Sequence, residues 1–212
     1  MLELGVKTLL AYLIGSLSGS LLLGRLRGID IREQGSGNAG STNALRTQGW
    51  KFAAGVLAFD IGKALVAVGI LPGLALPRVG YDTGIDGGWL AVCCAIAVVV
   101  GHVYPVWHEF RGGKGAATLL GTIAVLAPVA LLPFLGVWLA CLMLTGYVGL
   151  GTVLGVTSLP LYFAWALPGD TPLLVYGVAM AAFVGYTHRS NLQRMRAGTE
   201  SRARRLWLLR PR

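Results

Sequence analysis

The sequence predicts an all-α integral membrane protein with about seven transmembrane helices. Hydrophobic residues make up 55% of the chain and charged residues only 13%, about half the charge of a typical soluble domain. Long apolar runs fill most of the chain, and polar, basic stretches separate some of them. The 212 residues fit one polytopic membrane domain, residues 1–212, in which residues 197–212 form a basic cytoplasmic tail.

Seven apolar runs are candidates for the spans: residues 2–23, 52–71, 89–106, 116–126, 129–147, 151–167 and 173–186. A transmembrane helix needs about 20 residues, within a range of about 17–25. Several runs are shorter, so the segment 118–187 fits either two generous spans or four short ones. Pro128, Pro133 and Pro160 interrupt this segment, and two more prolines follow at 168 and 172. We therefore expect four spans here and seven in total, with five as the alternative.

The distribution of charge predicts the orientation. Residues 25–51, 109–114 and 189–212 hold 15 of the 18 basic residues, whereas the other loops are mainly acidic. Because basic loops tend to stay in the cytoplasm, we expect these stretches and the C-terminus to be cytoplasmic and the N-terminus external. The same tendency explains the net charge of +9 without nucleic acid as a partner. Arg25 and Arg27 follow the first apolar run, the reverse of a secretory signal, so this run is expected to be retained.

The first polar stretch, residues 35–46 (GSGNAGSTNALR), is typical of an anion-binding loop. Gly35, Gly37 and Gly40 have the spacing of a dinucleotide fingerprint, but a membrane helix precedes them where a βαβ unit is required, so a Rossmann site is excluded. Closely spaced glycines still let backbone N–H groups converge on an anion. Side chains that can add donors are those of Ser36, Asn38, Ser41, Thr42, Asn43 and Arg46. The two asparagines could instead hold the loop closed, and the alternative for the whole stretch is a flexible connector.

The second stretch, residues 101–118 (GHVYPVWHEFRGGKGAAT), places a lysine among glycines just before an apolar run. Lys114 is poorly placed for the dipole of a following helix unless an anion binds there as well. We therefore interpret Gly112, Gly113 and Lys114 as a second anion site. His102 could be a hydrogen-bonded core residue or part of the site.

The third stretch, residues 188–200 (HRSNLQRMRAGTE), follows the last apolar run. His188 and Asn191 are three residues apart and share a helix face. The alternative is an interfacial polar cap in front of a lipid-binding tail. We expect lipid binding of the tail residues Arg202, Arg204, Arg205, Arg210 and Arg212.

Two charged residues interrupt the second apolar run. A charge inside a span costs about 2.5–3.5 kcal/mol on insertion scales, so Asp60 and Lys63 are expected to pair or to face a polar interior. A structural ion pair and a catalytic role are both open. Cys93, Cys94 and Cys141 lie in apolar runs with neither a disulfide framework nor metal-ligand spacing, so no metal site is expected.

Four segments together resemble the bacterial acyl-phosphate-dependent glycerol-3-phosphate acyltransferases, the PlsY family. They are GSGNAGSTNALRTQG, AFDIGKA, GHVYPVWHEFRGGKGAAT and HRSNLQRMRAGTE, and the similarity runs from about Tyr12 to Glu200. The resemblance implies transfer of a fatty acyl group from acyl phosphate to the 1-position of glycerol 3-phosphate. The products would be lysophosphatidic acid and phosphate, in the first acylation of bacterial phospholipid synthesis. It further implies the inner membrane as location, no cofactor, and association with the soluble acyltransferase that makes acyl phosphate.

The resemblance also implies the site residues. The residues expected to be catalytic and to bind glycerol 3-phosphate are Ser36, Arg46, Lys114, His188 and Asn191. Those expected to bind substrate are Gly35, Ser36, Gly37, Asn38, Gly40, Ser41, Thr42, Asn43, Gly112 and Gly113. Acyl phosphate has a good leaving group and no H-x-x-x-x-D pair is present, so we expect direct transfer with either His188 or a substrate phosphate as base. The rival hypothesis is a small transporter of a phosphorylated solute, which would be expected to show repeated halves.

Overall fold

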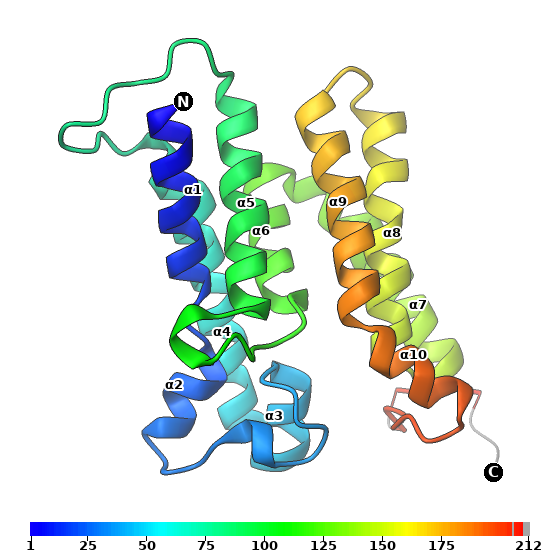
Figure 1. Ribbon diagram of the computed structural model, residues 1–212. Coiled ribbons are helices and arrows are strands. Elements are labelled where there is room, and N and C mark those ends of the chain that lie inside the picture. The colour runs from blue at the N-terminus through cyan, green and yellow to red at the C-terminus, as the bar shows by residue number, and fades with distance from the viewer. Residues whose placement is uncertain (205, 210–212) are drawn as a thin grey trace. The chain divides into compact units, whose positions relative to one another are not determined.

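The computed structural model describes residues 1–204 and 206–209, and the regular structure of these residues is helical throughout (Figure 1). The tail residues Arg205, Arg210 and Arg212, for which we expect lipid binding, lie outside the described residues. The α-helices are α1 (Leu2–Gly15), α2 (Gly19–Arg25), α3 (Ser41–Gln48), α4 (Trp50–Leu65), α5 (Gly87–Val103), α6 (Ala116–Leu126), α7 (Leu131–Thr145), α8 (Val148–Ala166), α9 (Thr171–Thr187) and α10 (Arg189–Arg196). Short turns of helix are η1 (Ile31–Glu33), the π-helical η2 (Val66–Ile70), η3 (Leu71–Gly73), η4 (Val106–His108) and η5 (Pro128–Ala130).

Several of these helices are long and apolar enough to cross a membrane. In the described part of the chain they are Trp50–Gly73, Gly87–His108, Pro128–Thr145 and Val148–Ala166. A fifth candidate is the pair α1 and α2, which is bent by 47° at a short break. The helices α6 and α9 are apolar but shorter. Each of the seven predicted apolar runs thus lies on a helix or a helix pair, which confirms an all-helical membrane protein with four to five clear spans.

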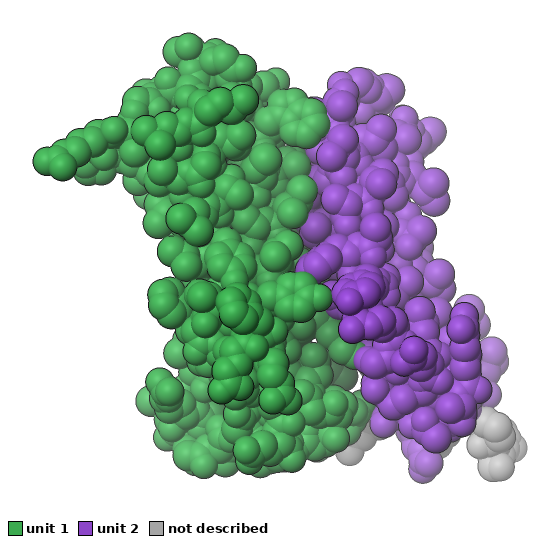
Figure 2. Space-filling view, in the orientation of Figure 1, with its two compact units in different colours: residues 1–126 green, residues 127–212 purple. Residues whose placement is uncertain are grey.

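The chain divides into two compact units, Met1–Leu126 and Ala127–Arg212 (Figure 2). In the first unit α1 packs closely on α5 because small residues face each other there. Gly15 lies against the backbone of Val98, and Gly101 lies against the backbone of Tyr12. A Cβ atom at either glycine would collide with the facing helix. The helix α4 packs on α6 in the same way at Gly121, which contacts Ile61.

The two ends of the first unit differ in what they carry (Figure 1). At one end, the N-terminus of α1 meets the loop of residues 74–86: Glu3 accepts a hydrogen bond from the backbone N–H of Asp82 at 2.7 Å and from Lys7 at 2.6 Å. At the other end lie α2, α3 and the loop of residues 104–115. The first and second polar stretches therefore share one end of this unit.

In the second unit α8 packs against both α7 and α9, and α7 is joined to α8 by a tight turn at Gly146, whose φ is 76°. The tail folds back onto this turn. Ala203 donates its N–H to the carbonyl of Gly146 at 2.8 Å, and Leu208 donates its N–H to that of Met143 at 2.9 Å. The side chain of Arg202 stacks over the rings of Tyr147 and Trp207. The described part of the tail is thus an ordered cap on the end of α7.

Candidate functional site

The first glycine-rich loop is closed by one buried side chain. Asn43, on α3, accepts a hydrogen bond from the backbone N–H of Ser36 at 2.9 Å. Its amide donates to the carbonyls of Ile31 at 3.2 Å and Gln34 at 2.9 Å. Gly35 and Gly37 have φ values of 57° and 72°, which favour glycine and let the loop turn back over α3. Of the two functions considered for Asn43, it performs loop closure.

The loop ends at the N-terminus of α3, which is suited to an anion. The N-cap residue is Gly40, which has no side chain that could cap the N–H groups of the first turn. Ser36, Thr42 and Arg46 are exposed on the same loop and helix. Thr42 and Arg46 are four residues apart on α3 and therefore lie on one face. Backbone donors, hydroxyls and a guanidinium are thus gathered where a phosphate group could bind.

A surface ion pair connects the first loop to the second. Arg32 contacts both carboxylate oxygens of Asp30, at 2.7–3.1 Å, and donates to the carbonyl of His108 at 3.1 Å. The hydrogen bonds from Arg32 hold the pKa of the Asp30 carboxyl below its ordinary value of 3.8. Asp30 and Arg32 could not be recognised as a link between the loops from the sequence, because nothing in the sequence places Arg32 near residue 108.

The second loop doubles back on the end of α5. Gly112 donates its N–H to the carbonyl of Val103, and Gly113 donates to that of His102, both at 3.1 Å. Gly113 also lies against the imidazole of His102, so that a Cβ atom at this position would collide with the ring. This close packing explains both glycines by sterics. It places Lys114 in the loop directly before α6, as expected from the sequence.

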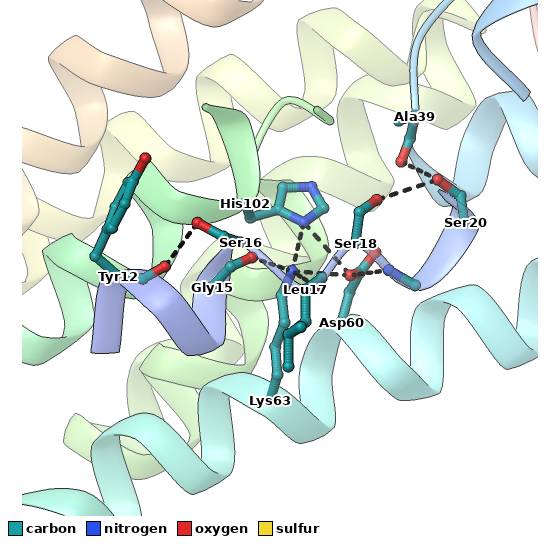
Figure 3. A network of polar contacts seen from close by, with 11 residues as sticks. Tyr12, Gly15, Ser16, Leu17, Ser18, Ser20, Ala39, Asp60, Lys63 and His102 are labelled. Carbon is teal, nitrogen blue, oxygen red and sulfur yellow. Dashed lines mark hydrogen bonds and ion pairs between the residues drawn. The ribbon is translucent and has the colours of Figure 1, made fainter. Parts of the chain in front are cut away.

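Asp60, Lys63 and His102 form a buried cluster in the first unit (Figure 3). Lys63 Nζ lies 3.1 Å from Asp60 Oδ1 and 3.0 Å from His102 Nδ1. The predicted pairing of Asp60 with Lys63 is confirmed. Of the alternatives for His102, the structure places it in this cluster as a buried, hydrogen-bonded residue. The three side chains come from two helices, α4 and α5.

The third stretch begins where α9 ends. His188 is buried, and its Nδ1 lies 2.9 Å from the carbonyl oxygen of Val184. Because a carbonyl oxygen only accepts, the hydrogen is on Nδ1, and Nε2 carries the lone pair when the ring is neutral. Asn191 follows on α10, and its amide donates to Glu200 Oε1 at 2.7 Å. His188 and Asn191 therefore lie within one turn of each other, as the spacing predicts.

Glu200 organises this stretch, although the sequence analysis did not assign it a role. Its other carboxylate oxygen, Oε2, accepts from Arg194 at 2.6 Å. Asn191 also packs against Gly149 of α8, where a Cβ atom would come within 2.9–3.1 Å of the asparagine side chain. Asn191 is thus held by contacts with a carboxylate and a glycine. In the sequence, Glu200 stands out as an acidic residue at the end of a basic stretch, and this could have indicated its role.

These observations describe an integral membrane protein whose helix ends carry glycine-rich, basic loops suited to anionic substrates. The sequence profile of the glycerol-3-phosphate acyltransferase family matches residues 6–198. A glycerol-3-phosphate acyltransferase of Synechococcus elongatus is 43% identical over 198 residues, which cover 92% of this chain and 91% of the relative. The chain therefore belongs to the glycerol-3-phosphate acyltransferase family and is a membrane acyltransferase.

Solved structures agree with this assignment. Two crystal structures of PlsY (YgiH), an integral membrane glycerol 3-phosphate acyltransferase, are similar to this chain. The glycerol 3-phosphate form superposes with a TM-score of 0.79 and the lysophosphatidic acid form with 0.77. Both are 31% identical to this chain, and each comparison covers 94% of both chains. The all-helical membrane character and the family recognised from the four sequence segments are thereby confirmed.

Proposed function

We propose that this acyltransferase moves a fatty acyl group from acyl phosphate to the 1-position of glycerol 3-phosphate. The observation that carries the proposal is the presence of two glycine-rich anion loops at one end of the first unit, each followed by a helix and each with a basic residue, Arg46 or Lys114. Two phosphate-bearing substrates require two such pockets. The relatives' names and the two ligand forms of PlsY support glycerol 3-phosphate as acceptor and lysophosphatidic acid as product.

The proposed chemistry is a direct transfer. The 1-hydroxyl oxygen of glycerol 3-phosphate attacks the carbonyl carbon of acyl phosphate, the new ester C–O bond forms, and the C–O bond to phosphate breaks. Inorganic phosphate leaves with the bonding electron pair. Since acyl phosphate is a mixed anhydride, positioning and charge stabilisation supply the catalysis, and no acyl-enzyme is needed.

The residues proposed to bind and activate glycerol 3-phosphate are Ser36, Arg46, Lys114, His188 and Asn191. Those proposed to form the substrate-binding loops are Gly35, Ser36, Gly37, Asn38, Gly40, Ser41, Thr42, Asn43, Gly112 and Gly113. Asn43 acts by closing the loop, which its three hydrogen bonds support. The exposure of Ser36, Thr42 and Arg46 supports direct contact with substrate.

The hydroxyl proton has two proposed acceptors, Nε2 of His188 and a substrate phosphate. The hydrogen bond between Nδ1 and Val184 supports the first, because it fixes the tautomer in which Nε2 is basic. His188→Gln separates them. If His188 is the base, this variant should lose the acidic limb of the pH–rate profile along with most of kcat. If phosphate takes the proton, the limb should persist while KM for glycerol 3-phosphate rises.

For the topology we propose seven spans in a bacterial inner membrane, with the N-terminus outside and the motif loops and C-terminus in the cytoplasm. Charge asymmetry and the position of two motif loops at one end of the first unit support this arrangement. Single cysteines at Glu33, Tyr81 and Ser201, in a chain whose native cysteines are replaced, would test it. Only Tyr81→Cys should react with an impermeant maleimide added outside the cell.

Association with the soluble acyltransferase that makes acyl phosphate is proposed on the same grounds. A donor produced in the cytoplasm would reach the motif loops directly if these loops face that compartment. The association would be tested by co-purification from cells that express both proteins. The amount of partner that co-purifies would be compared before and after Ser201→Cys is labelled with a bulky maleimide.

The donor itself gives the decisive experiment. Purified protein should form lysophosphatidic acid from glycerol 3-phosphate and palmitoyl phosphate, with no turnover of palmitoyl-CoA. Comparable rates with both donors would reject the proposed donor. Uptake of radiolabelled glycerol 3-phosphate into vesicles without product formation would instead support a transporter.

A further inference from the structure

The buried cluster of Asp60, Lys63 and His102 lies at the break between α1 and α2. The first apolar run does not form one straight helix: α1 ends at Gly15, α2 begins at Gly19, and the two axes differ by 47°. A break inside an apolar segment exposes carbonyl and N–H groups that require partners in the absence of water. The cluster supplies these partners.

Lys63 satisfies the end of α1. Its ammonium donates to the carbonyls of Gly15 and Leu17, each at 2.8 Å. Asp60 satisfies the start of α2, because its Oδ1 accepts the backbone N–H of Gly19 at 3.2 Å. A cation thus meets the carbonyl end of one helix, and a carboxylate meets the N–H end of the next, as helix dipoles favour. The ion pair therefore fixes both sides of the break (Figure 3).

From the break, contacts lead to the first anion loop. Ser20 on α2 donates to the carbonyl of Ala39 at 2.7 Å, and its hydroxyl lies 3.4 Å from that of Ser18. Ala39 is buried and directly precedes Gly40, the N-cap of α3. The direction in which α2 leaves the break therefore sets where α3 begins.

Contacts from the same cluster lead to the second loop. His102 Nδ1 lies 3.0 Å from Lys63 Nζ and 3.4 Å from Asp60 Oδ1. The carbonyl of His102 accepts the N–H of Gly113, and the ring packs against Gly113. Lys114 is the next residue. One ammonium group is thus connected to each loop through a short chain of contacts.

Stability alone is a poor explanation for this cluster. Buried ion pairs are weak sources of stability, because desolvation offsets their attraction. Asp60 Oδ2 is buried and accepts no hydrogen bond from any described residue, which adds to the cost. The geometry points to a different role.

We propose that Lys63 is a positioning residue for acyl transfer: with Asp60 and His102, it fixes the break between α1 and α2 and thereby the spacing of the two anion loops. This inference rests on the proposed function of those loops. Lys63 is not expected to contact substrate. Its effect is on how well the two substrates are aligned, where displacement of about 1 Å can cost about 100-fold in rate.

The test compares Lys63→Met with Lys7→Met in purified full-length protein. Lys7 is the matched control, because it is also buried, pairs with Glu3 and donates to the carbonyl of Pro72 at 2.7 Å. Lys63→Met should lower kcat about 10-fold to 100-fold per folded molecule, with a smaller change in KM for glycerol 3-phosphate. Lys7→Met should lower Tm and leave kcat unchanged. Equal kcat for wild type and Lys63→Met would overturn the proposal.

A double variant, Asp60→Asn with Lys63→Met, separates alignment from folding, because it leaves no unpaired charge buried. We expect it to regain Tm while kcat stays low. Recovery of both Tm and kcat in the double variant would assign the cluster to stability only. The same conclusion would follow if Lys63→Met and the double variant failed to fold while Lys7→Met folded. Wild-type protein that makes no lysophosphatidic acid from glycerol 3-phosphate and acyl phosphate would reject the proposed function itself.

Discussion

Two buried lysines of the first unit make nearly the same contacts. Lys7 pairs with Glu3 one helical turn away and donates to the carbonyl of Pro72, just after the π-helical part of the fourth helix. Lys63 pairs with Asp60 one turn away and donates to the carbonyls of Gly15 and Leu17. In both cases an ammonium group satisfies the carbonyls of a helix end in an apolar surrounding.

The two clusters differ in what they hold in place. Glu3 accepts the N–H of Asp82 and so fastens the loop of residues 74–86, which carries none of the polar motifs. The cluster around Lys63 holds α2 on one side and Gly113 on the other, and both lead to the loops proposed to bind anions. Buried charge alone therefore does not indicate a functional site. The segment that the charge holds decides whether its loss affects stability or turnover.

The largest effects should come from the loop residues themselves. Lys114→Ala should lower kcat/KM by about 10-fold to more than 100-fold, because a charged hydrogen bond in a desolvated site is worth about 1.5–3 kcal/mol. Arg46→Lys should also be impaired, since an ammonium cannot reproduce a two-pronged contact with phosphate. Specific activity is to be measured against inserted, monodisperse protein. Wild-type kcat/KM in both variants would mean that the residues only anchor helix ends.

Gly113→Ala should have the next largest effect, about 10-fold in kcat/KM, because its methyl group collides with the ring of His102. The loss should be smaller in a Lys63→Met background, where the ring is already displaced. Gly136→Ala, at a position with open space around it, is the control. If the losses in kcat/KM from Gly113→Ala and Lys63→Met were strictly additive in free energy, the second loop would not be coupled to the Lys63 cluster. The comparison between the two lysine clusters would then be weakened.

A change at the other end of the unit should affect stability only. Glu3→Gln leaves Lys7 buried beside a neutral partner and weakens the hold on the 74–86 loop. We expect a lower Tm and faster proteolysis within residues 74–86, with kcat and KM unchanged. A fall in kcat per folded molecule would show that the two ends are coupled.

The smallest effect is expected for the surface pair of Asp30 and Arg32. Asp30→Asn should lower activity about twofold or less, because ion pairs that water still reaches contribute little, and this pair is only half-buried. The pKa of Asp30 is lowered, so its contribution is present above the ordinary carboxyl pKa and is lost only as pH falls through the lowered value, below 3.8. The ratio of wild-type to variant activity should thus be constant between pH 5.5 and 8. A ratio that changes in this range would contradict the lowered pKa.

The extent of the helices could be predicted from composition. Residues 129–147 were expected to form one apolar run, and η5 with α7 covers Pro128–Thr145. Hydropathy suffices here because apolar surroundings leave the backbone few alternatives to a helix. The break at Gly15 could not be predicted. It depends on Gly15 packing against Val98 and on a hydrogen bond from Lys63, which come from two other helices.

In the candidate site, too, local features could be predicted from the sequence and contacts between distant residues could not. Glycine spacing and residue type indicated two anion loops, since φ values and hydrogen-bonding capacity are local properties. The choice between binding and loop closure for Asn43 required its contacts with Ile31 and Gln34. The meeting of Lys63 with His102 joins residues 39 positions apart, and the sequence offers no pattern for that distance. The count of seven spans and the roles of the site residues stay predictions.

The length of the first helix has a consequence for the path of the lipid product. With 14 residues, α1 rises only about 21 Å, whereas the hydrocarbon layer is about 30 Å thick. If α1 starts at the outer surface, the break after Gly15 lies within the hydrocarbon layer and does not reach the inner headgroups. Loops anchored to this break would hold the new ester at the depth of the lipid glycerol backbones. The acyl chain could then enter and leave sideways through the lipid, and the product would join the monolayer without first dissolving in water.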